Sequence, residues 1–396
     1  MTEYLNLLRR EKLLFETDIK RHAGLLSELV RQGKFLVLGG AGTIGQAVVH
    51  EIFKRNPERL HVVDISENNL VELVRDLRSS QGYIDGEFQT FALDIGSPEY
   101  ESYIAQAGSF DYVLNLSALK HVRSEKDPFT LMRMIKTNIL NTEKTIEQSI
   151  AAGAKKYFSV STDKAANPVN LMGASKRIME MFLARHSSDI SISSARFANV
   201  AFSDGSLLYG FDQRLKKQQP IAAPSDVRRY FVIPQEAGEL CLMSCLLGKN
   251  GDIFFPKLSE ALHLITFQEI AENYLASKGF EPLICESEEE ARRSSADGVN
   301  DGKWPCVFAE SNTTGEKPFE EFFTANEVVD EATFHSLGIV AADMTADNKL
   351  TDYFKTEINN MLVAGSWTKD EIVKLFRHML PGFNYSDKGE YLDGKM

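Results

Sequence analysis

Residues 160–177 read VSTDKAANPVNLMGASKR and bring together side chains that hold and release protons. Thr162, Asp163 and Lys164 follow directly on an apolar run that is typical of a strand, and Lys176 lies on the helix predicted after them. A carboxyl beside an amine gives one group that supplies a proton and another that accepts one. The segment therefore predicts an acid–base site at the end of a strand.

A second motif lies near the N-terminus, where Gly39, Gly42 and Gly45 form a G-x-x-G-x-x-G pattern. It stands between the apolar run FLVL and a helical segment, which is the context of a dinucleotide-binding loop. Glycines allow close approach to a pyrophosphate, and the free N–H groups of Thr43 and Ile44 at the helix N-terminus attract its charge. A tight turn without a ligand is the alternative.

Polar residues after the next two strands would border the adenosine half of such a cofactor. Asp64 ends the second predicted strand about 20 residues after Gly45, where a carboxylate accepts ribose hydroxyls and repels a 2′-phosphate, which favours NAD over NADP. Asp64 or Ser66 could also act as the N-cap of the next helix. Asp94 and Ile95, after the third strand, are placed to border the adenine.

Two more groups of candidates lie where later strands end. Ala118 and Lys120 follow the fourth strand, the first expected at the cofactor and the second at the substrate or cofactor. His121 stands beside them, although a packed histidine is the commoner role for such a residue. Glu125 on the same loop offers Lys120 an ion pair as an alternative.

Asn199 and Arg229 are the candidates in the second half of the chain. Asn199 follows the sixth predicted strand and is placed to hydrogen-bond a bound substrate. Arg229 follows a loop with two prolines, and a guanidinium there suits bidentate binding of a phosphate.

The spacing of apolar residues predicts the elements that position these side chains. From residue 34, short apolar runs alternate with helical segments of ten or more residues, which indicates β-α-β units and a parallel sheet. Strands are expected at 34–38, 60–64, 88–94, 110–117, 155–161 and 190–197. Helices are expected at about 43–55, 67–79, 128–152, 170–186, 236–248 and 266–279.

These elements define an α/β protein with a Rossmann-type doubly wound parallel sheet and a smaller C-terminal lobe. We expect the cofactor-binding domain at 34–200, and residues 201–340 mainly in a lobe that closes over the substrate at the carboxyl ends of the strands. Helical extensions are expected at 1–33 and 341–396. The apolar spacing of the first one fits a strap on its own domain or, as the alternative, a dimerisation or docking helix.

The composition limits the class of protein. With 43% hydrophobic and 25% charged residues, the 396-residue chain is typical of a globular protein, and its net charge of −12 argues against a nucleic-acid partner. No window reaches ~18 apolar residues, so we expect no membrane span and a cytoplasmic location. The four cysteines lack metal or C-x-x-C spacing, which predicts buried thiols and no metal site.

The segment STDKAANPVNLMGASKR resembles a known family when it is taken with GGAGTIG, SALKHV, KTNILNT, RFANV, RRYF and TGEKPFEEF in the same order. The family is that of the UDP-N-acetylglucosamine 4,6-dehydratases, the CapD-like polysaccharide-biosynthesis members of the extended short-chain dehydrogenases. The resemblance runs from about Lys34 to Phe323. Such dehydrogenases usually carry Tyr-x-x-x-Lys on the helix that bears Lys176, but here the tyrosine place is Met172, a thioether without an exchangeable proton.

The resemblance implies a redox cycle on UDP-N-acetylglucosamine with NAD as cofactor. Hydride leaves C4, a base removes the C5 proton, the C6 hydroxyl leaves as water, and the hydride returns to C6. In the family pattern Lys164 is the base, Asp163 is the acid, and Thr162 with Lys176 removes the proton of the 4-hydroxyl. Lys176 would also bind the nicotinamide ribose. Met172 favours retention at C5 in the UDP-4-keto-6-deoxy product.

Departures from the family pattern bear on substrate contacts. Many relatives have arginine where Asp204 and Thr313 stand, and alanine where Ser117 stands. Glu316, in the motif that follows Thr313, is expected to contact the substrate.

Two other functions compete with the dehydratase. A UDP-N-acetylhexosamine 4-epimerase returns the hydride to C4, needs no adjacent acid and base, and normally uses the missing tyrosine. A non-catalytic NAD-binding protein would need neither the Thr-Asp-Lys run nor Lys176. The N-terminal helices and the habit of the family suggest a homodimer or a larger homo-oligomer.

Overall fold

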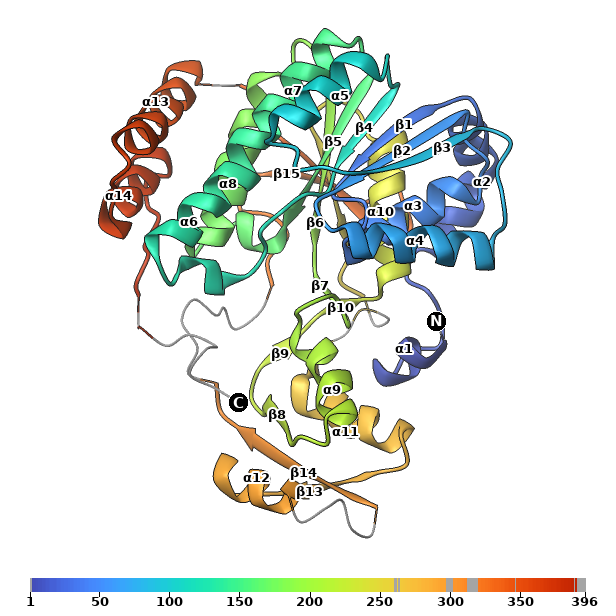
Figure 1. The fold of residues 1–396 in the computed structure, drawn as a ribbon, viewed down its shortest axis with the longest axis vertical. Helices are drawn as coiled ribbons and strands as arrows, with labels where there is room; N and C mark the ends of the chain where they lie inside the picture. The colour runs from blue at the N-terminus through green and yellow to red at the C-terminus, as the bar shows by residue number, and fades with distance from the viewer. Residues whose placement is uncertain are drawn as a thin grey trace.

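The computed structural model describes residues 2–259, 262, 264–296, 302–311, 320–345, 347–387 and 389. Within this part of the chain, nine strands form one central sheet in the order β15-β16-β11-β6-β5-β4-β1-β2-β3 (Figure 1). The first six strands in the chain pair in parallel, and their order reverses at β1. They are β1 (Lys34–Leu38), β2 (Arg59–Asp64), β3 (Glu87–Ala92), β4 (Tyr112–Asn115), β5 (Lys156–Thr162) and β6 (Ser191–Phe197).

Helices cover both faces of this sheet, which confirms the predicted doubly wound fold. Alternate residues of β1 face opposite ways, so Phe35 and Val37 pack in one core while Leu36 and Leu38 pack in the other. The first core contains residues of α2 (Glu16–Arg31), α3 (Thr43–Phe53), α4 (Glu67–Ser80) and α10 (Pro234–Leu247). The second contains residues of α5 (Pro98–Gln106), α6 (Pro128–Ile135), α7 (Asn141–Ala151) and α8 (Leu171–Arg185).

The predicted strands and helices of this region are present with small shifts at their ends. The long helix expected at 128–152 is interrupted by a π-helical turn at Lys136–Leu140. This turn carries the buried Asn138, whose side chain bonds both backbone groups of Leu119 and the hydroxyl of Ser175. The interruption therefore fixes the loop after β4, where Ala118 and Lys120 lie.

Residues 201–340 are shared between the large sheet and a smaller lobe. Strands β11 (Asp252–Pro256), β15 (Val328–Asp330) and β16 (Leu337–Ala341) extend the large sheet, with β11 parallel to β6 and antiparallel to β16. Residues after 200 thus contribute to both parts, and the predicted boundary at residue 200 does not separate the two sheets.

The smaller lobe has its own three-stranded parallel sheet, which lies apart from the large one (Figure 1). Its strands, in the order β13-β14-β8, are β13 (Glu281–Ile284), β14 (Lys303–Ala309) and β8 (Ile221–Pro224). Helices α9 (Leu207–Lys216), α11 (Phe267–Ser277) and α12 (Glu288–Ala296) accompany it. Two short pairs connect the lobe to the large sheet: β7 (Asn199–Val200) with β10 (Phe231–Val232), and β9 (Arg228–Arg229) with β12 (Ile265–Thr266).

Both ends of the chain pack on its own body. In the N-terminal segment, α1 (Thr2–Leu7) contributes Leu5 and Leu7 to the core of the smaller lobe, while α2 packs on α10. Between them Arg10 is buried in a two-bond ion pair with Glu236. The N-terminal helices therefore act as the strap that their spacing allowed.

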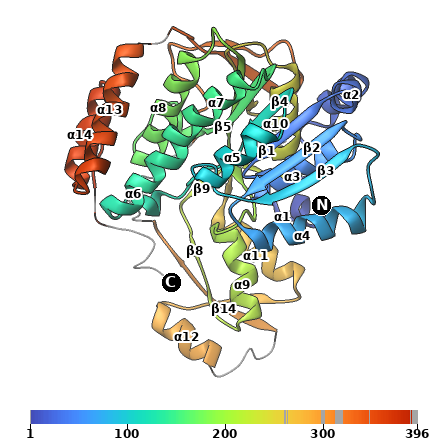
Figure 2. The same cartoon turned by 45° about the horizontal axis from the view of Figure 1, so that its top comes forward.

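At the other end, helices α13 (Asn348–Ala364) and α14 (Lys369–Met379) pack together and against α8 (Figure 2). None of the helices in the described ranges combines the length and the apolar character that crossing a bilayer requires. All four cysteines are free and buried.

Glu239 on α10 makes the stability of the fold depend on pH. It is 3% exposed, its Oε2 has no hydrogen-bond partner among the described residues, and burial raises its pKa to about 7. A carboxyl whose pKa is raised on folding gives stability that is present below its unfolded pKa and is lost as the pH rises through 7. We expect Glu239→Gln to stabilise the protein by about 2 kcal/mol at pH 8 and far less at pH 5, measured as Tm.

The control for this prediction is Glu72→Gln on α4, because Glu72 is exposed. That variant should leave the Tm difference between pH 5 and pH 8 unchanged. An equal shift in Tm at both pH values for Glu239→Gln would show that its charge is not the cause.

Candidate active site

The predicted glycine loop lies between β1 and α3, at the carboxyl end of the sheet. Gly39 has a φ of +72°, and a Cβ on it would lie 2.6 Å from the Ser117 nitrogen. A Cβ on Gly45 would lie 2.2 Å from the Gly39 oxygen, so the packing of α3 on the loop requires glycine there. At Gly42, the N-cap of α3, the nearest atom to a Cβ is 3.7 Å away, and no side chain among the described residues caps the helix. The protein thus leaves space in front of free helical N–H groups.

The residues expected around adenosine follow β2 and β3. Asp64 accepts the N–H of Ala41 and the N–H of Ser66, each at 2.9 Å, so its carboxylate is fixed beside the glycine loop. Ser66 is the N-cap of α4. Asp94 is exposed and accepts the Gly96 N–H at 2.8 Å, whereas the side chain of Ile95 packs in the core.

Thr162, Asp163 and Lys164 come together at the end of β5. The Thr162 hydroxyl donates to Asp163 Oδ1 at 2.8 Å, and Lys164 Nζ lies 3.3 Å from the same oxygen. Asp163 is 3% exposed, while 30% of the Lys164 side chain is exposed. A buried carboxylate is thus held between a hydroxyl and an ammonium that remains open to a ligand.

Lys176 and Met172 lie one turn apart on α8, and both are buried. Lys176 Nζ donates to the Val160 oxygen at 2.9 Å, on the strand that ends in Thr162. Burial lowers the Lys176 pKa to about 8, against an opposing effect of Glu180. A neutral amine is therefore accessible to Lys176 near physiological pH.

Glu125 reaches the start of α8 and does not pair with Lys120. Its Oε1 accepts the Met172 N–H at 2.7 Å, and burial raises the Glu125 pKa to about 7. Lys120 instead donates to the Ser203 hydroxyl at 3.2 Å. The alternative ion pair of Lys120 with Glu125 is wrong because Glu125 turns toward the helix N-terminus.

The loop around Asp204 contacts two loops of the large sheet, the glycine loop and the loop after β4 that carries His121. The Asp204 N–H donates to Thr43 Oγ1 at 2.9 Å, which ties this loop to the glycine loop. Gly205 has a φ of +70°, and a Cβ on it would lie 3.0 Å from Nε2 of the exposed His121. His121 is thus a loop residue at the boundary between lobe and sheet.

Asn199 and Arg229, both expected at the substrate, meet at a carboxylate that we did not predict. Asn199 Nδ2 donates to Oε1 of Glu320, and Arg229 Nε lies 3.6 Å from the same oxygen. Glu320 belongs to the TGEKPFEEF motif, so this motif was the signal that could have identified it. Glu316 of the same motif lies outside the described residues.

A buried ion network holds the segment after Glu320 onto the sheet. Arg196 on β6 is 0% exposed, and its guanidinium bonds Glu180 and Glu327 through two hydrogen bonds each. A further N–H donates to the Phe322 oxygen at 2.9 Å. The network fixes the backbone two residues beyond Glu320.

One group of described residues has the composition of a metal site. The ligand atoms of Glu143, Glu147 and His186 lie within 4.8 Å of one another. However, Lys355 Nζ lies 2.7 Å from a Glu143 oxygen and 3.9 Å from a Glu147 oxygen. An ammonium already supplies the positive charge at this place, so we propose no metal there.

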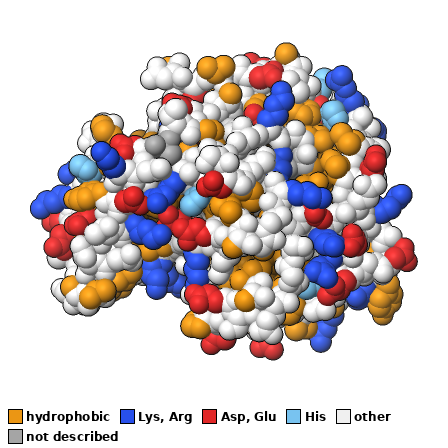
Figure 3. All heavy atoms as spheres, turned by 90° about the horizontal axis from the view of Figure 1, so that it is seen from above, with side chains coloured by type: hydrophobic (Ala, Val, Ile, Leu, Met, Phe, Trp, Pro, Cys, Tyr) orange, Lys and Arg blue, Asp and Glu red, His pale blue; other side chains and the backbone are white. Residues whose placement is uncertain are grey.

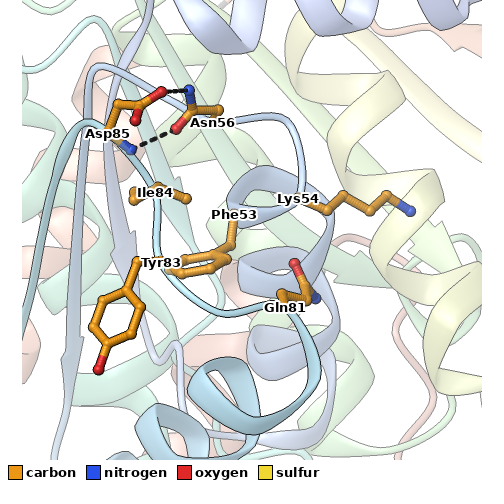
Figure 4. Close-up of a pocket in the computed structure, with 7 residues that line it drawn as sticks. All are labelled: Phe53, Lys54, Asn56, Gln81, Tyr83, Ile84 and Asp85. Atoms are coloured by element: carbon orange, nitrogen blue, oxygen red, sulfur yellow. Dashed lines mark hydrogen bonds between the residues drawn. The ribbon is translucent and has the colours of Figure 1, made fainter.

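A shallow depression of about 210 Å³ lies at the opposite end of α3 from the glycine loop (Figure 4). Asn56 and Asp85 close its rim through two hydrogen bonds of 2.7 and 2.8 Å. It contains none of the predicted site residues; its lining is Phe53, Lys54, Asn56, Gln81, Tyr83, Ile84 and Asp85. On the face shown in Figure 3, acidic and basic side chains are interspersed, with no continuous basic surface of the kind that binds nucleic acid.

Comparison with known proteins agrees with the resemblance. The profile of a family described as polysaccharide biosynthesis protein matches residues 35–341. An uncharacterized membrane protein of Methanocaldococcus jannaschii is 31% identical over 264 residues, which cover 65% of this chain and 76% of that protein. The capsular polysaccharide biosynthesis protein CapD of Staphylococcus aureus is 25% identical over 92% of this chain. The match spans only 56% of the length of CapD.

Solved structures share the fold at lower identity. Pen from Bacillus thuringiensis has a TM-score of 0.63 at 22% identity, over 80% of this chain and 90% of that one. DesIV, a dTDP-glucose 4,6-dehydratase from Streptomyces venezuelae, has a TM-score of 0.54 at 16% identity, over 73% and 88% of the two chains. With the glycine loop, the Thr-Asp-Lys group and a profile match over most of its length, the chain belongs to the polysaccharide biosynthesis protein family.

Proposed function

We propose that this protein is an NAD-dependent UDP-N-acetylglucosamine 4,6-dehydratase that retains the configuration at C5. The observation that carries the proposal is Asp163, which is held between the Thr162 hydroxyl and the Lys164 ammonium while Met172 takes the place of a tyrosine. An acid and a base on adjacent residues suit the removal of water from neighbouring carbons.

The residues of the glycine loop fit a dinucleotide. The open space at Gly42 in front of the first N–H groups of α3 suits a pyrophosphate, and Asp64 stands fixed where a ribose would lie. A carboxylate at that place favours NAD over NADP. When bound, NAD supplies the reversible acceptance of a hydride.

The side chains of the site then have distinct tasks. Thr162 holds the 4-hydroxyl, and Lys176, whose amine is partly neutral near its pKa of about 8, helps to remove its proton. Once C4 is a ketone, the C5 proton is acidic and passes to Lys164. The C6–O bond breaks as its oxygen takes a proton from Asp163 and leaves as water, while a C5=C6 double bond forms.

Gly42→Ala tests the cofactor site without disturbing the fold. The backbone of Gly42 has a φ of −74°, which alanine adopts freely, and its Cβ would meet no protein atom closer than 3.7 Å. We expect an unchanged Tm but a Kd for NAD that is raised about tenfold or more, because the methyl group enters the space of the pyrophosphate. Gly24→Ala on α2, where a Cβ has open space, is the control. Unchanged NAD affinity in Gly42→Ala would contradict this cofactor site.

A 4-epimerase is the second candidate, since solved structures of this fold include a UDP-N-acetylglucosamine 4-epimerase from Methanobrevibacter ruminantium. UDP-N-acetylglucosamine deuterated at C4 separates the two functions. A dehydratase moves the deuterium into the C6 methyl group, whereas an epimerase leaves it on C4 and forms the galacto isomer. A protein that binds NAD but converts no UDP-sugar would support the non-catalytic alternative. We further propose a homodimer or larger homo-oligomer in the cytoplasm.

A further inference from the structure

Glu320 is a buried carboxylate that several neighbouring groups hold in place. The residue is 5% exposed, and its carboxyl is held from two strands of the connection between lobe and sheet. Asn199 donates to Oε1, Arg229 Nε lies 3.6 Å from the same oxygen, and the Tyr230 N–H lies 3.5 Å from Oε2. A carboxyl placed by three neighbours and connected to the Arg196 network through Phe322 is fixed in position.

The ionisable groups that act on Glu320 include Asp163 and Lys164, the proposed acid and base. Burial and then the charge of Asp163 raise its pKa, Arg229 and Lys164 lower it, and the result is a pKa of about 7. Tyr230, the other ionisable neighbour, has its own pKa raised by burial and by Glu320. Thr162 pairs with Phe197, two residues before Asn199, and Asn167 bonds Glu321, so Glu320 lies beside the turn that carries Asp163 and Lys164. Asp163 and Glu320 are both buried, whereas the Lys164 side chain is 30% exposed, so water screens the charge of Glu320 more at Lys164 than at Asp163.

The position of Glu320 bears on the elimination, because that step requires one proton to be on Asp163 and not on Lys164. At rest, Asp163 and Lys164 form an ion pair at 3.3 Å. The reaction needs a protonated Asp163 and a neutral Lys164, which is the same pair with one proton moved across that contact. A negative charge that acts more strongly on Asp163 than on Lys164 favours this shift. After the elimination, the C5 proton is on Lys164 and the Asp163 proton has left in water, so the ion pair is restored.

We propose that Glu320 is a positioning residue of this active site, whose ionised carboxyl shifts the Asp163–Lys164 ion pair toward its neutral, reactive form. Asn199 and Arg229 hold Glu320 in place and so contribute to the acid–base site as well as to any contact with the substrate. The inference rests on the proposed dehydratase function.

Glu320→Gln tests the inference, since the amide keeps the size of the side chain and removes its charge. We expect kcat to fall by roughly tenfold to a hundredfold with KM within about twofold, because the change affects the chemical step. The wild-type kcat should rise with pH in two steps, through about 7 as Glu320 ionises and through about 8 as Lys176 becomes neutral. The step near 7 should be absent from the variant, and the step near 8 should remain. Glu320→Asp should restore part of the rate. An unchanged kcat and pH profile in Glu320→Gln would overturn the proposal.

Glu321→Gln is the matched control, because Glu321 is the next residue and bonds Asn167 at the exposed surface. It should keep the wild-type pH profile. A second readout does not depend on turnover. Glu125 and Glu239 also have pKa values of about 7, so the readout is a difference infrared spectrum in which their bands cancel. The spectrum of the wild type minus that of Glu320→Gln should show one protonated carboxylic acid that titrates near pH 7, and the wild type minus Glu321→Gln should show none.

These two readouts separate failure of the inference from failure of the proposed function. If the wild type forms no dehydrated product, the dehydratase proposal fails, and the infrared titration alone decides whether Glu320 carries the proton. If the product forms but the difference spectrum of the wild type minus Glu320→Gln contains no carboxylic acid band that titrates near pH 7, the role of Glu320 is wrong while the dehydratase stands.

Discussion

Replacing Lys164 with methionine should lower the turnover of UDP-N-acetylglucosamine by roughly a hundredfold to ten-thousandfold, the usual contribution of a positioned acid or base. Lys164 is the partly exposed group beside the buried Asp163, and methionine keeps its length while removing the amine. The measurement is kcat from the C6 methyl product, with Kd for the UDP-sugar measured separately. We expect that Kd to change little.

The same variant also shows at which step the reaction stops. In the proposed mechanism oxidation at C4 precedes the task of Lys164, so reduced nicotinamide should accumulate in a single turnover of Lys164→Met. Lys126→Met is a suitable control, because Lys126 is an exposed lysine outside the Thr-Asp-Lys group. Full turnover in Lys164→Met would remove Lys164 as the base, and loss of the oxidation step as well would give it an earlier role.

Replacing Arg196 with methionine should destabilise the protein by about 3 to 5 kcal/mol, because it leaves buried carboxylates without their partner. Arg196 is 0% exposed and bonds both Glu180 and Glu327. Arg177→Met is the control: it removes an arginine that contacts the same two acids but whose side chain is 35% exposed, so less than about 1 kcal/mol is expected. Denaturant unfolding of the two variants measures the difference.

The pH dependence of this effect follows from the Glu180 pKa. Burial opposes ionisation, but Arg196 above all lowers the pKa of Glu180 to about 2. A carboxyl whose pKa is lowered on folding gives stability that is present above its unfolded pKa near 4.5 and is lost as the pH falls toward 2. The destabilisation by Arg196→Met should therefore shrink below pH 4.5, and a triple variant with Glu180→Gln and Glu327→Gln should recover stability at pH 7. Equal losses in Arg177→Met and Arg196→Met would contradict this role of burial.

The parallel part of the fold could be predicted from sequence because all of its strands except the edge strand β3 are largely buried. Such strands leave continuous apolar runs, as in FLVL before the glycine loop, and these runs mark strand positions well. Helices α5 and α9 were missed because they are short and mix apolar with charged residues. The place of β11 and β16 in the large sheet was also missed, since pairing across distant parts of the chain has no local signal.

In the candidate site, contacts between residues close in sequence could be predicted, whereas contacts between distant residues could not. Thr162, Asp163 and Lys164 are adjacent, and their contact follows from local geometry. Glu320 lies far along the chain, and only the fold brings it to Asn199 and Arg229. Asn199 and Arg229 were thus predicted as site residues, but the carboxylate that they hold was not. For Ile95 the sequence predicts a cofactor contact from its place after a strand, and the structure adds that its side chain packs in the core.

We propose above all that this site removes water from C5 and C6 of UDP-N-acetylglucosamine. Proton NMR of the protein with NAD and this substrate in deuterated water tests it most directly. We expect a new C6 methyl signal, deuterium at C5, and a C5 coupling that shows retained configuration. UDP-N-acetylgalactosamine without a methyl signal, or an unchanged substrate, would contradict it.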